Sequence, residues 1–121
     1  MHEIGIVRSM CRTVSDYAKE HKVNPSDISE IVCACGELSL VVPKYVEELY
    51  PVVLDDFPEL KGAKLVLETV PGFAECEECD EIFNVVENKG YCPKCGSFDK
   101  QVLSGKEFTI EEIHLREQAE D

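Results

Sequence analysis

Helical and extended patterns of apolar residues alternate along the first half of the chain. Between residues 4 and 21, apolar side chains recur at steps of three and four, which predicts an amphipathic helix with one buried stripe. This stripe consists of Ile4, Val7, Cys11, Val14 and Ala18. Residues 24–27 contain a proline among polar residues and predict a turn. Residues 28–40 then contain a strand, whose apolar centre is 31–35.

A second helix and two further strands follow. Pro43 predicts the start of the helix, because a proline at the first helical position gives up no needed N–H bond. Its buried face is expected to consist of Val46, Leu49, Tyr50, Val53 and Leu54. Pro51 predicts a kink, since it lacks an amide proton and crowds the preceding turn, and the helix is expected to end near residues 57–58. The strands are predicted over 63–70 and 107–115.

The order helix, strand, helix, strand, insert, strand predicts an α+β fold. Two helices pack on a small mixed three-stranded sheet, and a zinc-ribbon-like lobe is inserted before the last strand. The predicted α/β domain comprises residues 1–72 and 104–121, and the lobe comprises 73–103, with Pro-Gly and Ser-Gly pairs at the two boundaries. The two strands that flank the insert can pair antiparallel at its base.

Four cysteines in the insert form two C-x-x-C pairs, Cys76 with Cys79 and Cys92 with Cys95. In a zinc knuckle the two-residue gap lets both sulfurs face one point, and two knuckles complete a tetrahedral shell. Gly96 and Asp80 follow the pairs where such a tight turn needs a positive φ. The spacing therefore predicts a closed structural zinc site, which stabilises a lobe too small to bury a core unaided.

Other roles for the cysteines agree less well with the sequence. A thioredoxin-like redox pair needs a strand before it and a helix after it, whereas both pairs lie in turn-rich segments. A hydrolase needs an open zinc position or a nucleophile motif, and we find neither, so we predict that the chain is not an enzyme. Cys33 and Cys35 can form a second metal pair, but together with Cys11 we interpret them as buried small hydrophobes on apolar faces.

Charge and hydropathy narrow the classes of partner. The formal net charge is −13, from 25 acidic and 12 basic residues, and the lysines and arginines are scattered. Nucleic-acid-binding modules present basic patches to the phosphates, so we expect no nucleic-acid partner. No apolar run approaches the roughly 18 residues of a membrane span, and no secretory leader is recognised. We therefore expect a cytoplasmic protein with no membrane association.

The first three residues carry the other candidate chemistry. The terminal amine of Met1, the amide nitrogen of His2 and its imidazole can chelate one metal ion through fused rings. Nitrogen donors in a plane suit Ni(II) or Cu(II), and Glu3 adds an amide or a carboxylate. Taken alone, a histidine at position two is more often a polar residue near a chain end, so these residues do not by themselves predict a site.

Short motifs follow one another in a specific order along nearly the whole chain. They are Met1-His2-Glu3, Gly36-Glu37-Leu38-Ser39 leading to Pro43, Gly62-Ala63-x-Leu65, the two cysteine pairs with Gly96-Ser97, and Gly105 to Ile110. C-P-x-C-G alone occurs in many zinc ribbons, but the ordered set is specific. In this combination the chain resembles the HypA/HybF family of hydrogenase nickel-incorporation proteins. The resemblance implies a two-lobed metallochaperone, with a nickel-binding α/β domain and a structural zinc lobe.

The resemblance also implies ligands, cargo and partners. Ni(II) is the transient cargo, and its ligands are His2, the terminal amine of Met1 and Glu3, whereas Zn(II) is structural. The implied partners are a HypB-type GTPase, the large subunit of [NiFe]-hydrogenase and, in some species, urease maturation proteins. Many relatives carry an acidic residue where this chain has Val42, so no ligand is implied from that loop. His21 and His114 match no metal motif of the family.

Two questions stay open at the level of sequence. The chain can act as a monomer or a homodimer. The alternative function is a zinc-ribbon adaptor for transcription or other protein complexes, although the acidic charge and the lack of a basic stripe favour the metallochaperone.

Overall fold

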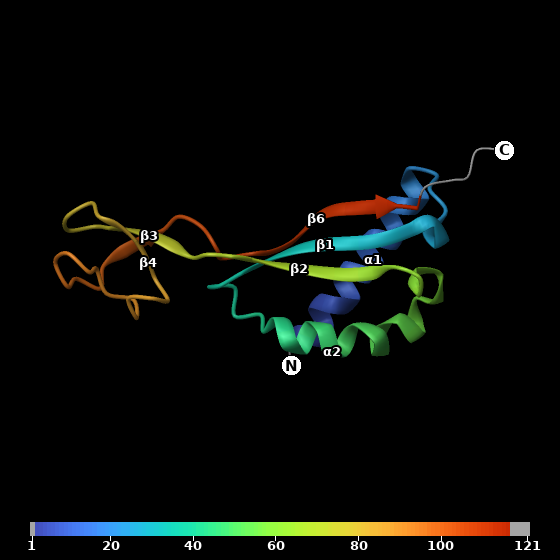
Figure 1. Cartoon of the computed structure of the whole chain (residues 1–121), viewed down its shortest axis with the longest axis horizontal. Helices are drawn as coiled ribbons and strands as arrows, with labels where there is room; N and C mark the ends of the chain where they lie inside the picture. The colour runs from blue at the N-terminus through green and yellow to red at the C-terminus, as the bar shows by residue number, and fades with distance from the viewer. Residues whose placement is uncertain (1, 117–121) are drawn as a thin grey trace. The chain divides into compact units, whose positions relative to one another are not determined.

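The computed structural model describes residues 2–116, and for His2 only the backbone (Figure 1). The chain forms two compact units. The first comprises Met1–Cys33, Val42–Leu67 and Ile110–Asp121, and the second comprises Ala34–Val41 and Glu68–Thr109. Residues 73–103, the range predicted for the inserted lobe, lie within the second unit. No helix in the described range combines the length and the apolar composition needed to span a membrane.

The elements before the cysteine segment follow the predicted order. They are α1 (His2–Glu20), the 3₁₀ turn η1 (Pro25–Asp27), β1 (Ile28–Gly36), α2 (Pro43–Val53), the 3₁₀ turns η2 (Leu54–Asp56) and η3 (Pro58–Leu60), and β2 (Lys64–Val70). Four of the five residues in the stripe predicted for α1, Val7, Cys11, Val14 and Ala18, are fully inaccessible, whereas Ile4 is half-buried. The last strand, β6, spans Phe108–Leu115.

α2 begins at Pro43, as predicted, but ends earlier than predicted. The helix contains Pro51 and stops at Val53, and η2 then leads to Phe57. Proline supplies no N–H to the preceding turn, so the helical ladder is already weakened there. The amide of Leu54 is shared between the carbonyls of Tyr50 and Val52, and the chain tightens into the 3₁₀ turn.

β1 is the central strand of the first sheet, whose order is β2-β1-β6 (Figure 1). β6 lies antiparallel to β1, since Gly36 N donates to Glu107 O at 2.9 Å and Arg116 N donates to Asp27 O at 2.7 Å. β1 and β2 run in the same direction, as a strand-helix-strand crossover through α2 requires (Figure 1). The mixed three-stranded sheet is therefore confirmed.

The predicted pairing of the strands that flank the insert is wrong, because β1 lies between β2 and β6. β1 is the most apolar strand, and residues 31–36 are all buried. A strand buried in this way must satisfy its backbone N–H and C=O groups on both edges, which the central position allows.

Both helices pack on the first unit's part of the sheet. α1 packs against α2, and Cys33 Sγ of β1 lies 3.4 Å from Met10 Sδ of α1. Tyr50 of α2 donates its hydroxyl to Ala63 O at 2.8 Å, just before β2 begins. Burial, with a smaller contribution from the charge of Glu59, raises the pKa of the Cys11 thiol to about 11, so Cys11 is a neutral core residue.

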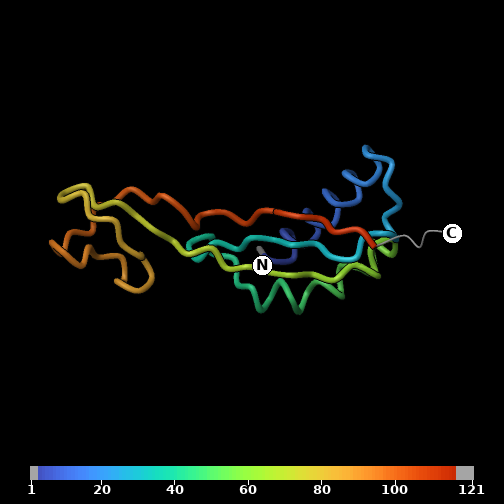
Figure 2. The backbone as a smooth tube through the Cα atoms, turned by 45° about the horizontal axis from the view of Figure 1, so that its top comes forward, coloured from blue at the N-terminus to red at the C-terminus, as the bar shows by residue number. Residues whose placement is uncertain are grey.

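The second unit contains a small antiparallel sheet that the sequence patterns did not predict. Its order is β4-β3-β5, formed by Phe73–Cys76, Ile82–Asn84 and Lys100–Val102. Figure 2 shows the chain leaving β2, passing through these strands and returning to β6. The buried cluster is only Ala74, Cys76, Phe83 and Cys92, with Cys79, Val85 and Val102 packed against it. So small a core needs a further source of stability.

Candidate metal centre

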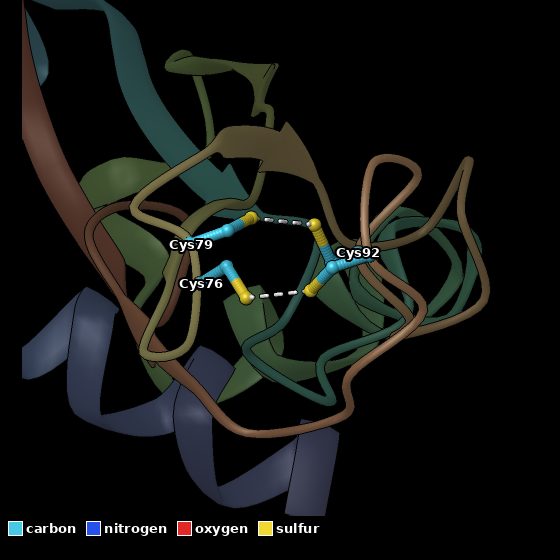
Figure 3. Close-up of side chains that lie close together, drawn as sticks. Cys76, Cys79 and Cys92 are labelled. Atoms are coloured by element: carbon cyan, nitrogen blue, oxygen red, sulfur yellow. Dashed lines mark hydrogen bonds between the residues drawn. The ribbon is translucent and has the colours of Figure 1, made fainter.

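The four predicted cysteines converge in the second unit. The sulfur atoms of Cys76, Cys79, Cys92 and Cys95 all lie within 4.8 Å of one another. Cys76 Sγ is 3.5 Å from Cys95 Sγ, and Cys79 Sγ is 3.5 Å from Cys92 Sγ, so each short contact joins the two C-x-x-C pairs. Figure 3 shows the side chains of Cys76, Cys79 and Cys92 pointing toward one another. All four are free thiols.

The two C-x-x-C turns have the same backbone hydrogen bonds. In the first knuckle, Asp80 N donates to Cys76 O at 3.0 Å and Cys76 N to Glu81 O at 2.8 Å. In the second, Gly96 N donates to Cys92 O at 2.8 Å and Cys92 N to Ser97 O at 2.9 Å.

The residue after each pair is left-handed, with φ of 66° at Asp80 and 78° at Gly96, which confirms the predicted turn. Two loops with matching turn hydrogen bonds therefore present their sulfurs to one point.

The separations suit a tetrahedral metal ion. Sulfurs about 2.3 Å from a central zinc ion are about 3.8 Å apart, close to the separations of the four thiols. A disulfide would need about 2.05 Å, far shorter than the 3.5 Å contacts between the knuckles. Four thiolates around one point are typical of zinc or of an iron–sulfur site, and they leave no open coordination position. The donor set fits a closed structural site.

The thiols alter one another's pKa values. The backbone of Glu81 lowers the pKa of Cys79, but burial and hydrogen bonds with the other three thiols raise it to about 12. Burial raises the pKa of Cys92, but the backbone of Cys95 and Lys94 and the neighbouring thiols lower it to about 7. One thiolate therefore forms easily and opposes the formation of others. A bound cation removes that opposition, so metal binding releases protons.

The remaining cysteines and histidines lie outside this centre. Among the side chains that the structure describes, the four-cysteine group is the one cluster of His, Cys, Asp and Glu with converging ligand atoms. Cys35 Sγ donates to Val41 O at 3.6 Å and is buried, as are Cys11 and Cys33, which agrees with their interpretation as small hydrophobes. His21 stacks on Tyr17 with ring centroids 4.2 Å apart. His114 lies 3.0 Å from Glu112 on the edge strand β6.

The N-terminal candidates are described only in part. Met1 and the side chain of His2 lie outside the described residues. α1 begins at His2, two positions before the predicted start, and its first four N–H groups have no acceptor within the helix. Glu3 is only 8% exposed, a burial that the sequence pattern did not indicate. A carboxylate in the first turn offsets the positive end of the helix dipole. Val42 caps α2 without a side-chain hydrogen bond.

Comparison with known proteins identifies the family. Residues 1–115 match the family described as "HypA: Hydrogenase/urease nickel incorporation, metallochaperone, hypA". The chain is 33% identical over 117 residues to the Hydrogenase maturation factor HypA of Nostoc sp., with 97% of each chain covered. It is 34% identical over 118 residues to that of Geobacter metallireducens, covering 95% of this chain and 99% of the relative. The chain belongs to the HypA family.

The fold agrees with that of HypA proteins of known structure. The solution structure of the Ni metallochaperone HypA from Helicobacter pylori matches with a TM-score of 0.66 at 20% identity, covering 96% of this chain and 98% of that one. A second HypA solution structure matches with a TM-score of 0.67 at 22% identity, covering 95% and 96%. The resemblance inferred from the ordered motifs is therefore confirmed, and HypA proteins are maturation factors and metallochaperones.

Proposed function

We propose that this chain binds one Ni(II) ion at its N-terminus and helps deliver it to the large subunit of a [NiFe]-hydrogenase. The observation that carries the proposal is the match to the nickel-incorporation family over residues 1–115. The relatives at 33% and 34% identity are named hydrogenase maturation factors, and both are covered almost end to end.

The proposed nickel ligands are the Met1 amine, His2 and Glu3. Nitrogen donors from successive residues suit Ni(II), and a site at a chain end can both take up an ion and release it. Two donors of Glu3 are compatible with this proposal, its backbone amide and its carboxylate. The substitution Glu3→Gln separates the two donors, because it removes the carboxylate and keeps the backbone amide. Glutamine is chosen because it has the same size as glutamate and the Glu3 side chain is nearly buried. Nickel binding that survives Glu3→Gln assigns the amide, and binding that is lost assigns the carboxylate.

The proposed zinc site uses Cys76, Cys79, Cys92 and Cys95. Convergent thiols on matched knuckles support a structural Zn(II), which would stabilise residues 73–103, while residues 1–72 and 104–121 form the nickel-binding domain. A closed shell offers no position for a substrate, so we assign no catalysis to the chain.

The proposed partners are a HypB-type GTPase, the hydrogenase large subunit and, where urease is present, its maturation proteins. The proposed site of action is the cytoplasm. The family's description names both hydrogenase and urease, which supports including both acceptors.

The decisive experiment counts both metals in one sample. Nickel binding is measured by calorimetry and zinc by elemental analysis, on a chain with a free, untagged N-terminus and on its His2→Ala variant. We expect the parent to bind about one Ni(II) and the variant to lose it, while both keep one zinc per chain. If the two chains bind nickel alike, or neither binds it, the nickel site is wrong, and a zinc-ribbon adaptor becomes the better explanation.

A transfer assay tests delivery itself. The parent, loaded with Ni(II), is mixed with a metal-free hydrogenase large subunit and the GTPase, and nickel in the large subunit is counted after separation. His2→Ala, loaded under the same conditions, is the matched control. Transfer that is equal for the two proteins contradicts delivery through the N-terminal site.

A further inference from the structure

The carboxylate of Glu37 joins two separate segments of the second unit. Glu37 directly follows β1, and its Oε1 accepts hydrogen bonds from Gly72 N at 2.9 Å and from Asn84 Nδ2 at 3.3 Å. Its own amide donates to Val70 O at 2.9 Å. One carboxylate oxygen thus accepts hydrogen bonds both from the segment between β2 and β3 and from the last residue of β4.

The two donors flank the first knuckle, which lies between β3 and β4, and Asn84 is also connected to the second knuckle. Gly72 precedes β3, which ends at Cys76 in the first knuckle. Asn84 is the last residue of β4, and its Oδ1 accepts from Glu87 N at 2.9 Å while its carbonyl accepts from Asn88 Nδ2 at 2.8 Å.

The path from Asn84 continues to the second knuckle. Tyr91 N donates to Asn88 O at 3.0 Å, and the next residue along the chain is Cys92. Short hydrogen-bonded paths therefore connect Glu37 to a cysteine of each pair.

Close backbone packing holds Glu37 in place. A Cβ atom added to Gly36 would lie 2.1 Å from Gly105 O, and one added to Gly105 would lie 2.7 Å from the Cα of Gly72. Leu38 N, on the other side of Glu37, donates to Gly105 O at 2.7 Å. Because backbone lies against backbone on both sides, the chain at Glu37 has little room to shift.

We propose that Glu37 is a positioning residue for the four-cysteine centre, fixing the two knuckles relative to each other through Gly72 and Asn84. A tetrahedral shell requires both sulfur pairs in place at once, so loosening either knuckle favours release of the ion. By linkage, a bound ion stabilises the Glu37 hydrogen bonds by the same factor. This inference rests on the proposed zinc site.

The size of the effect follows from the exposure of Glu37. Residues outside the ligand shell typically change metal affinity by about 10- to 100-fold. Glu37 is exposed to solvent, where water competes for its hydrogen bonds, so we place its effect at about five- to tenfold, around the lower limit of that range.

The test compares zinc release from the parent and four single variants into an excess of a chromophoric chelator. Glu37→Ala and Asn84→Ala are expected to release zinc about five- to tenfold faster than the parent. Glu37→Gln keeps the accepting oxygen and is expected to stay within about twofold of the parent. The matched control is Glu87→Ala, which removes an equal charge but keeps the Glu87 amide that bonds Asn84.

A double variant tests whether the two residues act together. Removing the Glu37 side chain is expected to have a smaller effect in the Asn84→Ala background than in the parent, because one of its two bonds is already gone. The thermal melting of the helical circular dichroism signal is expected to stay unchanged in Glu37→Ala, which separates positioning from general destabilisation.

Three results contradict the proposal. The first is that Glu37→Ala and Asn84→Ala release zinc no faster than Glu87→Ala. The second is that Glu37→Gln releases zinc as fast as Glu37→Ala. The third is that the effects of Glu37→Ala and Asn84→Ala on the release rate are independent in the double variant. A parent that retains no zinc instead rejects the zinc site itself, so the two failures are distinguishable.

Discussion

The two metal sites considered for this chain differ in how they are built. The four-cysteine centre has its cysteines on two loops whose hydrogen bonds and left-handed residues match each other. The proposed nickel site lies at one chain end, where α1 begins at His2 and Glu3 is nearly buried. The first site has four converging thiols on two hydrogen-bonded turns, whereas the second depends on donors from three consecutive residues. This difference suits an ion that stays and an ion that is passed on.

The largest expected effect comes from removing one ligand of the closed site. Cys92→Ser should abolish zinc retention and unfold residues 73–103, because a structural zinc contributes on the order of 10 kcal/mol and the local core is small. Zinc per chain and dispersion of the amide resonances check this. Cys35→Ser, a buried cysteine outside the cluster, should keep one zinc. A Cys92→Ser variant with full zinc content would contradict the assignment of the ligands.

Blocking the chain end should affect only the open site. Acetylation of the Met1 amine removes it as a nickel donor. Nickel affinity should then decrease at least tenfold, because a coordinate bond contributes more than about 1.4 kcal/mol. Zinc content should not change. Calorimetry with nickel, on acetylated and free chains of otherwise identical sequence, makes the comparison, and equal affinities would exclude the amine as a ligand.

The two knuckles should respond differently to a change in the left-handed residue. Gly96→Ala should cost about 1–2 kcal/mol, because alanine is strained at a positive φ, although a Cβ there meets nothing within 4 Å. Asp80→Gly should cost nothing, since glycine adopts this conformation freely. Thermal unfolding of the zinc-loaded proteins measures both. If Gly96→Ala and Asp80→Gly had equal effects on the unfolding free energy, the two positions would not both require a left-handed residue, which contradicts the matching turns.

The smallest expected effect is a pH dependence that separates His2 from His114. Glu112, as hydrogen-bond acceptor and nearby charge, and then Glu30 raise the pKa of His114 above 6.5. His114 therefore adds stability that is complete below pH 6.5 and disappears as the pH rises through its raised pKa. His114→Gln should flatten this small dependence.

The pH dependence of nickel affinity should be set by His2 and not by His114. A ligating imidazole must be neutral, so nickel affinity should decrease as the pH falls below about 6.5. His114→Gln should leave that decrease unchanged, as measured by calorimetry at several pH values. If the nickel affinity of His114→Gln no longer decreased at low pH, His114 would be part of the nickel site.

Local patterns predicted most of the elements correctly. The apolar stripe of α1, Pro43 at the start of α2 and the turn residues Asp80 and Gly96 each depend on neighbouring residues only. The small sheet β4-β3-β5 was missed because its strands are only three or four residues long and too short to show a period. The end of α2 was misplaced because the chain tightens after Pro51, where the Leu54 amide is shared between the carbonyls of Tyr50 and Val52, and the apolar pattern does not show this change.

The sequence by itself determined the family, the two knuckles and the convergence of their four cysteines, because cysteine spacing and turn chemistry act within a few residues. Only the tertiary structure decided that β1 lies between β2 and β6, that Glu3 is buried, and that Glu37 is bonded to both Gly72 and Asn84. These features join residues far apart in the chain. They depend on how buried backbone groups find partners across the whole fold, which no local pattern specifies.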